Sequence, residues 1–223
     1  MLPNRIKINK VAMKHIRLLI LVLVGLLLSN HCCAYDFKVD GIRYNIIDAE
    51  AKEVEVTNEV NSHNEWVGYD GDIVIPSSVE YQGVTYKVVA IGNSAFREEE
   101  QDWNFEPWST LNSVTISEGI KKIDSSAFSD CVVLKKLILP STIEYIGSNA
   151  FNECRSIESF EMPNNVKKIE KYTFWRCKGL KNINLGNVAE IDYGAFGQCS
   201  ILQSITLPNC IISLGERVFS DCI

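Results

Sequence analysis

The chain repeats itself with a period of about 23 residues. The segment SSAFSDCVVLKKLILPSTIEYIG, residues 125–147, is followed at once by SNAFNECRSIESFEMPNNVKKIE, residues 148–170, in which the same residue types recur at the same places. One phenylalanine of the unit recurs at steps of 23, 23, 22 and 23 residues: Phe128, Phe151, Phe174, Phe196 and Phe219. A fixed period in the twenties is typical of a solenoid, in which stacked units bury one continuous core.

Each unit carries the signal of one short strand and one tight turn. In LKKLIL, Leu134–Leu139, the apolar Leu137 and Leu139 occupy alternate positions, as in a half-buried strand. A proline, which cannot donate to a strand ladder, follows at Pro140 and at two equivalent positions. The motif SSAFSDC then predicts a short polar-capped helical or 3-10 turn around a buried Ala-Phe pair. The sequence therefore predicts short parallel strands on one face of a solenoid, and short turns and loops on the other.

These motifs resemble a known repeat class. IGSNAFNECRSIESFEMPNNV, residues 146–166, is similar to the repeat of the BspA-like leucine-rich-repeat family of bacterial surface and secreted proteins, with Ile157, Phe160 and Met162 at leucine or valine positions. The resemblance extends over about Tyr35 to Ile223. It implies a leucine-rich-repeat solenoid that is displayed at or beyond the bacterial envelope, and that acts in ligand binding or adhesion. Some members of the family bind host matrix proteins.

The N-terminus has the pattern of an export signal. Residues 1–34 contain five cations and no acid, and the apolar run 18–28 is shorter than the roughly 20 residues that span a bilayer. We expect a signal peptide that begins at Met1 or at the better-placed Met13 and is cleaved after Ala34. Free export is favoured over a lipoprotein anchored through Cys32, because the residues before that cysteine fit a lipoprotein signal poorly. The expected location is therefore secreted or in the cell envelope, at the outer surface or in the periplasm, without a transmembrane anchor.

The remainder divides into a cap and a solenoid. Apolar residues alternate around the turn signal Asp40–Gly41, which predicts a β-rich N-terminal cap over residues 35–72. The solenoid is expected over residues 73–223, with about six rungs. Because Phe96 precedes Phe128 by 32 residues, nine extra residues form an insertion at 97–110.

Five of the eight cysteines follow the repeat, three residues after each phenylalanine: Cys131, Cys154, Cys177, Cys199 and Cys222. Equivalent residues of neighbouring rungs lie about 4.8 Å apart, which is within reach of a disulfide, but their side chains point the same way, against the torsion that a disulfide needs. The spacing also differs from the paired cysteines of zinc sites. The column is therefore expected to be buried and structural, and Cys210, outside the register, is the odd thiol.

Charge and histidine content exclude several functions. The five cations of residues 1–34 are among 22 in the chain, so the remainder carries 17 basic and 28 acidic residues, a balance that repels nucleic acid. His63 is the one histidine after residue 34, which leaves no histidine metal site and no catalytic triad. No nucleotide-binding loop or metalloprotease motif is present. We expect a non-enzymatic protein without a cofactor or metal; a thiol or carboxylate enzyme is the less favoured alternative.

The outward residues of the predicted strands are the candidate binding site. They are Ser113, Thr115, Lys136, Ile138, Ser159, Glu161, Asn182, Asn184, Ser204 and Thr206. Only one of them is acidic, so the sheet offers no pair of catalytic carboxylates. This band of hydroxyls and amides suits shallow recognition of a protein or glycan, including host extracellular matrix, and equally suits an ordinary solvated sheet. Trp103 and Trp108 in the insertion either join this site or cover the junction between cap and solenoid.

One further alternative stays open. The chain could be a structural element of the envelope, or a fragment of a longer repeat array, without a ligand of its own.

Overall fold

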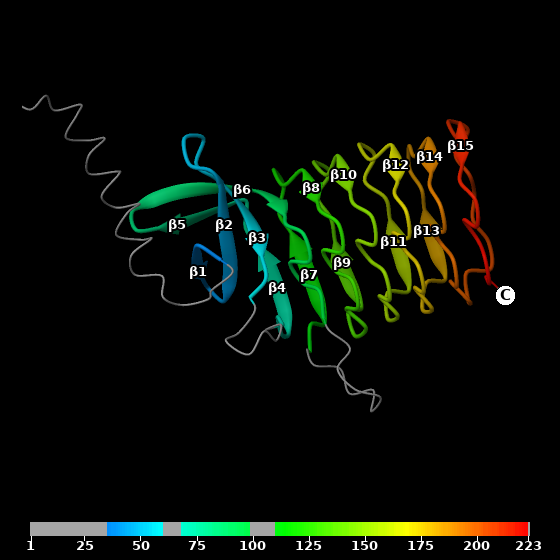
Figure 1. Cartoon of the computed structure of the whole chain (residues 1–223), viewed down its shortest axis with the longest axis horizontal. Coiled ribbons are helices and arrows are strands. Elements are labelled where there is room, and N and C mark those ends of the chain that lie inside the picture. The colour runs from blue at the N-terminus through cyan, green and yellow to red at the C-terminus, as the bar shows by residue number, and fades with distance from the viewer. Residues whose placement is uncertain (1–34, 60–67, 99–109, 223) are drawn as a thin grey trace, which may run out of the picture.

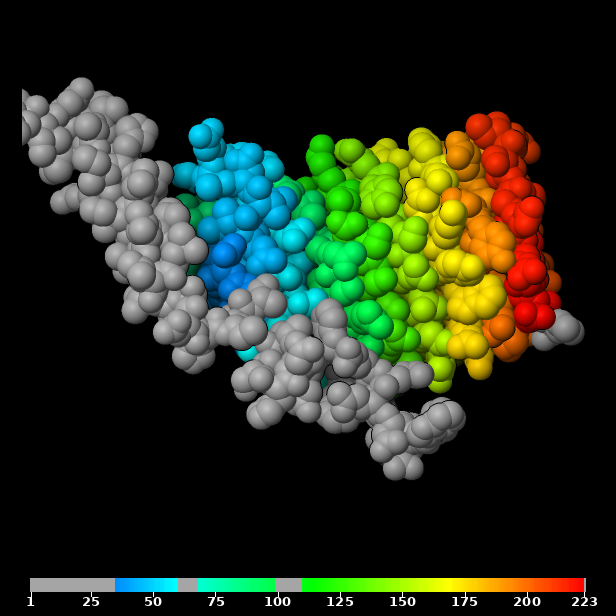
Figure 2. Space-filling view, viewed as in Figure 1, coloured from blue at the N-terminus to red at the C-terminus, as the bar shows by residue number. Residues whose placement is uncertain are grey.

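The computed structural model describes residues 35–59, 68–98 and 110–222, and its parallel strands stack along one long axis (Figure 1). The predicted signal segment, and Trp103 and Trp108 of the predicted insertion, lie outside the described residues. In the space-filling view successive rungs form adjacent layers from the cap to the C-terminal end (Figure 2). Among the described residues, no helix has the length and hydropathy needed to cross a lipid bilayer.

The N-terminal end is a small β-sheet. β1 (Phe37–Val39), β2 (Ile42–Asp48) and β3 (Glu53–Thr57) form an antiparallel meander, and β5 (Ser78–Tyr81) pairs with β6 (Val84–Ile91) as a second hairpin. The predicted turn at Asp40–Gly41 is confirmed, because both residues have the positive φ angles, 48° and 83°, of a type I′ hairpin. β3 lies parallel to β6, whose last residues pair with the first short strand of the solenoid. One sheet therefore runs from the cap into the repeats.

The strand face is formed by the longer strand of each rung. The strands are β4 (Asp72–Ile75), β7 (Ser113–Ile116) and β9 (Lys136–Ile138) in one sheet, and β11 (Ser159–Glu161) and β13 (Asn182–Asn184) in another. All neighbours are parallel and in register, as predicted for stacked repeats.

A second ladder of two-residue strands runs along another side of the solenoid. Its members are β8 (Lys122–Ile123), β10 (Tyr145–Ile146), β12 (Lys168–Ile169), β14 (Glu190–Ile191) and β15 (Ser213–Leu214). They pair in parallel, and the isoleucine of each of the first four points into the core. The sequence did not predict these strands.

The turn face joins these two ladders, and here the structure differs from the predicted helical or 3-10 turn. Ala127 N–H donates to the Asp124 carbonyl within the turn, but the next amide, that of Phe128, donates to the Ala150 carbonyl of the next rung at 2.8 Å. Ser126 has a φ of 55°, which breaks any helical continuation. The backbone amides of each turn thus donate alternately to a carbonyl of the same turn and to a carbonyl of the next rung. No helix occurs in the described parts of the chain.

The turn bonds also hold the solenoid together where both strand ladders are interrupted. No pairing is assigned between β9 and β11 or between β10 and β12 in the described structure. At the same level, Ser126, Phe128 and Asp130 donate backbone N–H groups to the next rung at 2.8–2.9 Å. The rungs therefore stay in register across the gap.

Columns of identical residues fill the core. The phenylalanine rings from Phe96 to Phe219 stack with centroids 4.8–5.7 Å apart, and Tyr69 of the cap covers the first ring at 4.5 Å. Tyr69 also contacts Arg43, whose guanidinium lies over the Tyr69 ring and forms an ion pair with Glu59 at 2.7 Å. The first four columnar cysteines are fully buried, which confirms their predicted position; Cys222, on the last rung, is partly exposed.

The last rung departs from the predicted pattern. Residues 202–208 form no strand, so the predicted strand residues Ser204 and Thr206 lie outside the ladder. An edge position does not by itself account for this, because β15 on the same rung also pairs with one neighbour only and forms a strand. Leu207, Leu214 and Phe219 on this rung are each more than a third exposed, whereas their equivalents in the inner rungs lie deeper.

Candidate binding surface

The strand face presents two outward columns of side chains. The first column contains Asp72, Ser113, Lys136, Ser159 and Asn182, and the second contains Val74, Thr115, Ile138, Glu161 and Asn184. Eight of the ten predicted site residues thus lie on strands of this face, and Ser204 and Thr206 lie beyond its last strand. Asp72 and Val74 were not predicted. The alternation in DIVI followed by Pro76 is the signal that could have revealed them.

Hydrogen bonds between neighbouring rungs fix the polar side chains of this face. Ser113 Oγ donates to Asp72 Oδ1 at 2.6 Å, and Asn112 Nδ2 donates to the same oxygen at 3.0 Å. These bonds, that of Ser113 first, lower the pKa of the Asp72 carboxyl below its ordinary value. Farther along, Asn184 Nδ2 donates to Glu161 Oε2 at 2.8 Å. Both carboxylates are therefore acceptors held in fixed positions.

An apolar stripe crosses the first three strands of the face. Val74 and Ile138 are 64% and 43% exposed, and they flank Thr115 in register on β4, β7 and β9. A strand that is half buried has to expose its other face, but these two positions carry branched aliphatic side chains where polar ones would be better solvated. The face thus combines apolar contact area with flanking hydroxyl, amide and carboxylate groups.

The two carboxylates on the strand face lie far apart. Asp72 and Glu161 lie in different columns and three rungs apart, too far to act on one bond. Within residues 35–59, 68–98 and 110–222, no group of three or more His, Cys, Asp or Glu side chains could hold a metal ion.

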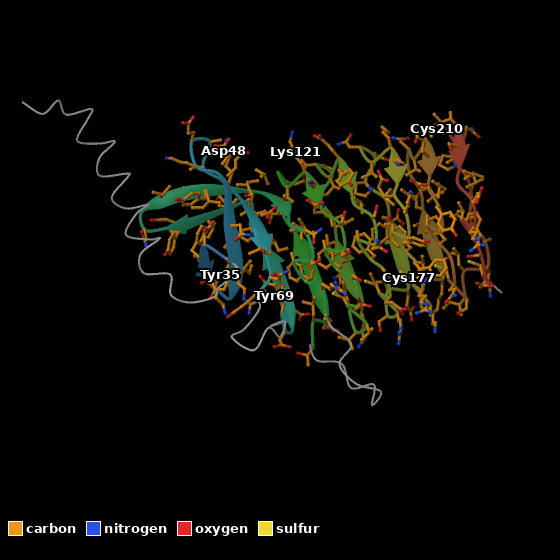
Figure 3. All side chains as sticks on the ribbon, in the orientation of Figure 1. Tyr35, Asp48, Tyr69, Lys121, Cys177 and Cys210 are labelled. Carbon is orange, nitrogen blue, oxygen red and sulfur yellow. The ribbon has the colours of Figure 1, made fainter. Side chains whose placement is uncertain are left out.

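The cysteine column is occupied in packing and hydrogen bonding. Each thiol donates to the carbonyl oxygen of the phenylalanine one rung earlier, with Sγ···O distances of 3.0–3.1 Å. Burial raises the pKa of the Cys199 thiol to about 12, and burial likewise raises the pKa of the other buried members. A neutral buried thiol is a poor nucleophile. Cys210 is exposed and lies outside the column, near β14 and β15 (Figure 3).

The comparisons with known proteins agree with this geometry. The family model for the BspA type leucine rich repeat region matches residues 101–223 in six copies. The chain belongs to this family. A search of the curated proteins gave no match.

Solved structures of bacterial leucine-rich-repeat proteins share the fold. A leucine rich cell surface protein from Faecalibacterium prausnitzii has a TM-score of 0.56 at 22% identity, over 83% of this chain and 52% of that protein. The pneumococcal vaccine antigen PcpA has a TM-score of 0.65 at 21% identity, over 83% of this chain and 47% of that one. A leucine-rich repeat protein from Bacteroides capillosus has a TM-score of 0.52 at 23% identity, over 66% of this chain and 95% of that one. The chain spans about half the length of the first two proteins.

Proposed function

We propose that this BspA-type protein is exported and acts as a non-enzymatic binding module, which recognises a protein or glycan through its strand face. The observation that carries the proposal is the pair of exposed side-chain columns on β4, β7, β9, β11 and β13, held in register by parallel ladders above a closed core. Adhesion to host extracellular matrix is the role that such a surface would serve.

The physical basis of the proposal is preorganisation. The backbone of the face is fixed by the stacked rungs, and Asp72 and Glu161 are fixed by hydrogen bonds to neighbouring rungs. Binding to such a surface loses little conformational entropy, so even a shallow contact can have useful affinity. The stripe of Val74, Thr115 and Ile138 supplies the apolar part of that contact.

Export is supported by two independent observations. Residues 1–34 have the charge and apolar pattern of a signal peptide. Two of the similar structures are described as a cell surface protein and as a vaccine antigen. We therefore propose that the protein acts outside the cytoplasm, either free or held at the cell envelope.

The test is a binding screen with a matched pair of substitutions. The purified chain is passed over immobilised fibronectin, laminin, collagen and host glycans by surface plasmon resonance. Ile138→Asp places a charge in the centre of the strand face, and Ile212→Asp makes the same change at a side chain that is 77% exposed outside it. We expect Ile138→Asp to weaken binding by about tenfold or more and Ile212→Asp to leave it unchanged.

Two results would contradict the proposal. One is equal affinity of both aspartate variants, and the other is the absence of binding to every surface in the screen. A variant with Trp103 and Trp108 both changed to alanine tests the insertion separately, and undiminished binding by it would restrict the site to the strand face.

A further inference from the structure

The turn face carries an aromatic cluster on one rung. Tyr172 and Trp175 lie on the same turn with ring centroids 5.3 Å apart and planes at 90°, and Tyr193 of the next rung lies 5.4 Å from Tyr172. All three side chains are partly exposed. We call these three residues the aromatic platform. It lies on the turns, whereas the strand face lies on the longer strands, so the two surfaces are built from different parts of each rung.

The platform is an exception within its own columns. The position of Tyr172 is occupied in other rungs by Ser126, Asn149 and Arg217, and the position of Trp175 by Ser129, Asn152 and Ser220. Because other rungs form the same turn with polar side chains at these two positions, the two aromatic rings are not needed to form the turn.

The following rung is modified to receive the rings. It has Gly194 next to Tyr172 and Gly197 next to Trp175. A Cβ at Gly194 would lie 2.8 Å from Tyr172 Cε1, and a Cβ at Gly197 would lie 2.1 Å from Trp175 Cζ3.

The backbone does not require these glycines. Gly194 has a φ of 62°, but Asn149 and Arg217 adopt 57° and 55° at the same position of other rungs. Gly197 has no left-handed φ, and every other rung has a residue with a side chain at this position, such as Ser129 and Asn152. The two glycines therefore leave room for the rings, which pack against the next rung.

Polar groups with fixed positions lie on the same turns as the rings and on the turn before. Arg176, next to Trp175, donates from Nε to Gln198 Oε1 at 2.8 Å and from Nη1 to Glu153 Oε1 at 2.8 Å. On the other side, the Arg217 guanidinium lies 6.0 Å from the centre of the Tyr193 ring. Amide, guanidinium and carboxylate groups thus share these turns with partly exposed aromatic rings.

We propose that the aromatic platform is a second binding site, which takes a glycan made of β-linked pyranose sugars. Such a sugar has an apolar C–H face, which the negative face of an aromatic ring attracts, and a rim of hydroxyls, which need donors and acceptors in fixed places. The platform and the network of Arg176, Gln198 and Glu153 offer both. This proposal does not depend on the function of the strand face.

A protein partner fits this site less well. The centre of a protein interface is depleted of charged residues and gains affinity from dry apolar pockets. Here the Arg217 guanidinium lies over the Tyr193 ring, and the ion pair of Arg176 and Glu153 joins the turn of Trp175 to the turn before it. The residues that the rings pack against in the next rung are glycines.

The test is isothermal titration of the purified chain with chitohexaose and cellohexaose. We expect at least one hexasaccharide to bind, Trp175→Ala to weaken its binding by about tenfold or more, and Trp175→Phe to retain most of the affinity. Gln198→Ala removes one amide of the polar network without changing a ring, and it is also expected to weaken binding. It serves as the test if Trp175→Ala does not fold. Asn182→Ala, on the strand face, is the control and should bind the sugar as the wild type does.

The outcomes separate the two sites. Loss of sugar binding in Asn182→Ala but not in Trp175→Ala would assign the glycan to the strand face and overturn this inference. The absence of binding at about 1 mM of either hexasaccharide would also overturn it. If Trp175→Ala instead abolishes binding to an unglycosylated matrix protein and leaves sugar binding intact, the platform is a protein contact and the glycan assignment is wrong.

Discussion

The stacked phenylalanine column makes a quantitative prediction about where the solenoid is strong. Phe151 is fully buried between Phe128 and Phe174, whose ring centroids lie 5.6 and 5.5 Å away. Phe219, at the end of the column, is 37% exposed and contacts one ring of the column, that of Phe196 at 5.7 Å. The same substitution, phenylalanine to alanine, can be made at both sites.

The two costs follow from burial. Phe151→Ala removes a fully buried ring and leaves a cavity closed on both sides, so we expect a loss of about 3–5 kcal/mol in the free energy of unfolding. At Phe219 part of the ring is already in water and the vacated space opens to solvent, so about 1–2 kcal/mol is expected. For a chain of this length these values correspond to roughly 6–20 °C and 2–8 °C in Tm.

The assay is thermal and urea unfolding of both variants, followed by circular dichroism. Equal losses at the two positions, or a larger loss at Phe219, would refute the reasoning, because the order depends only on a closed column with one open end. Hydrogen exchange provides the control: Phe219→Ala should increase exchange in the last turn and leave the turn of Phe151 protected.

Two further predictions concern the thiols and the aromatic platform. The pKa of Cys199 is raised by burial from 9.0 to about 12, so the folded state holds its proton more tightly than the unfolded state; the stability that this provides is present below pH 9 and is lost as the pH rises from 9 through 12. The free energy of unfolding, and with it the urea midpoint, should therefore fall over this range. In Cys199→Ala the free energy of unfolding should fall less steeply, by up to about 1.4 kcal/mol per pH unit. An identical slope in the variant and the wild type would contradict a raised pKa of Cys199. Gly197→Ala should destabilise the chain by about 1–3 kcal/mol because the new methyl group overlaps the Trp175 ring, and the loss should shrink in the Trp175→Ala background; a double-mutant cycle with zero coupling would show that the ring does not rest on this glycine.

The repeat period made the interior predictable. Because equivalent residues of a solenoid share one environment, an alignment on Phe128 and Phe151 was enough to place the phenylalanine and cysteine columns inside. The alternation around Leu137 likewise located the longer strands. These features depend on residue type and spacing alone, which is why sequence reasoning found them.

The connections were less predictable, because they depend on bonds between rungs. Ser126 has an ordinary polar side chain, and nothing in its identity indicates that it adopts a positive φ and donates its amide to the next turn. The two-residue strand at Tyr145–Ile146 is too short to produce a period. Residues 202–208 form no strand although the repeat alignment predicts one there, which shows that the alignment does not encode whether a given rung forms its ladder bonds.

Eight of the ten residues on the strands β4, β7, β9, β11 and β13 that face outward were predicted, and the platform was missed. The strand positions follow from alternation, whereas the platform is visible only when Tyr172 is aligned with Gly194 and Trp175 with Gly197, one rung apart. That pairing of a large side chain with a glycine is a signal that can be sought in other repeats.

Thiol labelling under native conditions tests the central claim of a closed stack most directly. The purified chain is treated with a small alkylating reagent, and the modification of each cysteine is followed in time by peptide mass spectrometry. The exposed Cys210 should react at once, and Cys131, Cys154, Cys177 and Cys199 should react only as fast as the chain unfolds. Rapid labelling of those four, or peptides joined by disulfides between them, would contradict the stack of rungs described here.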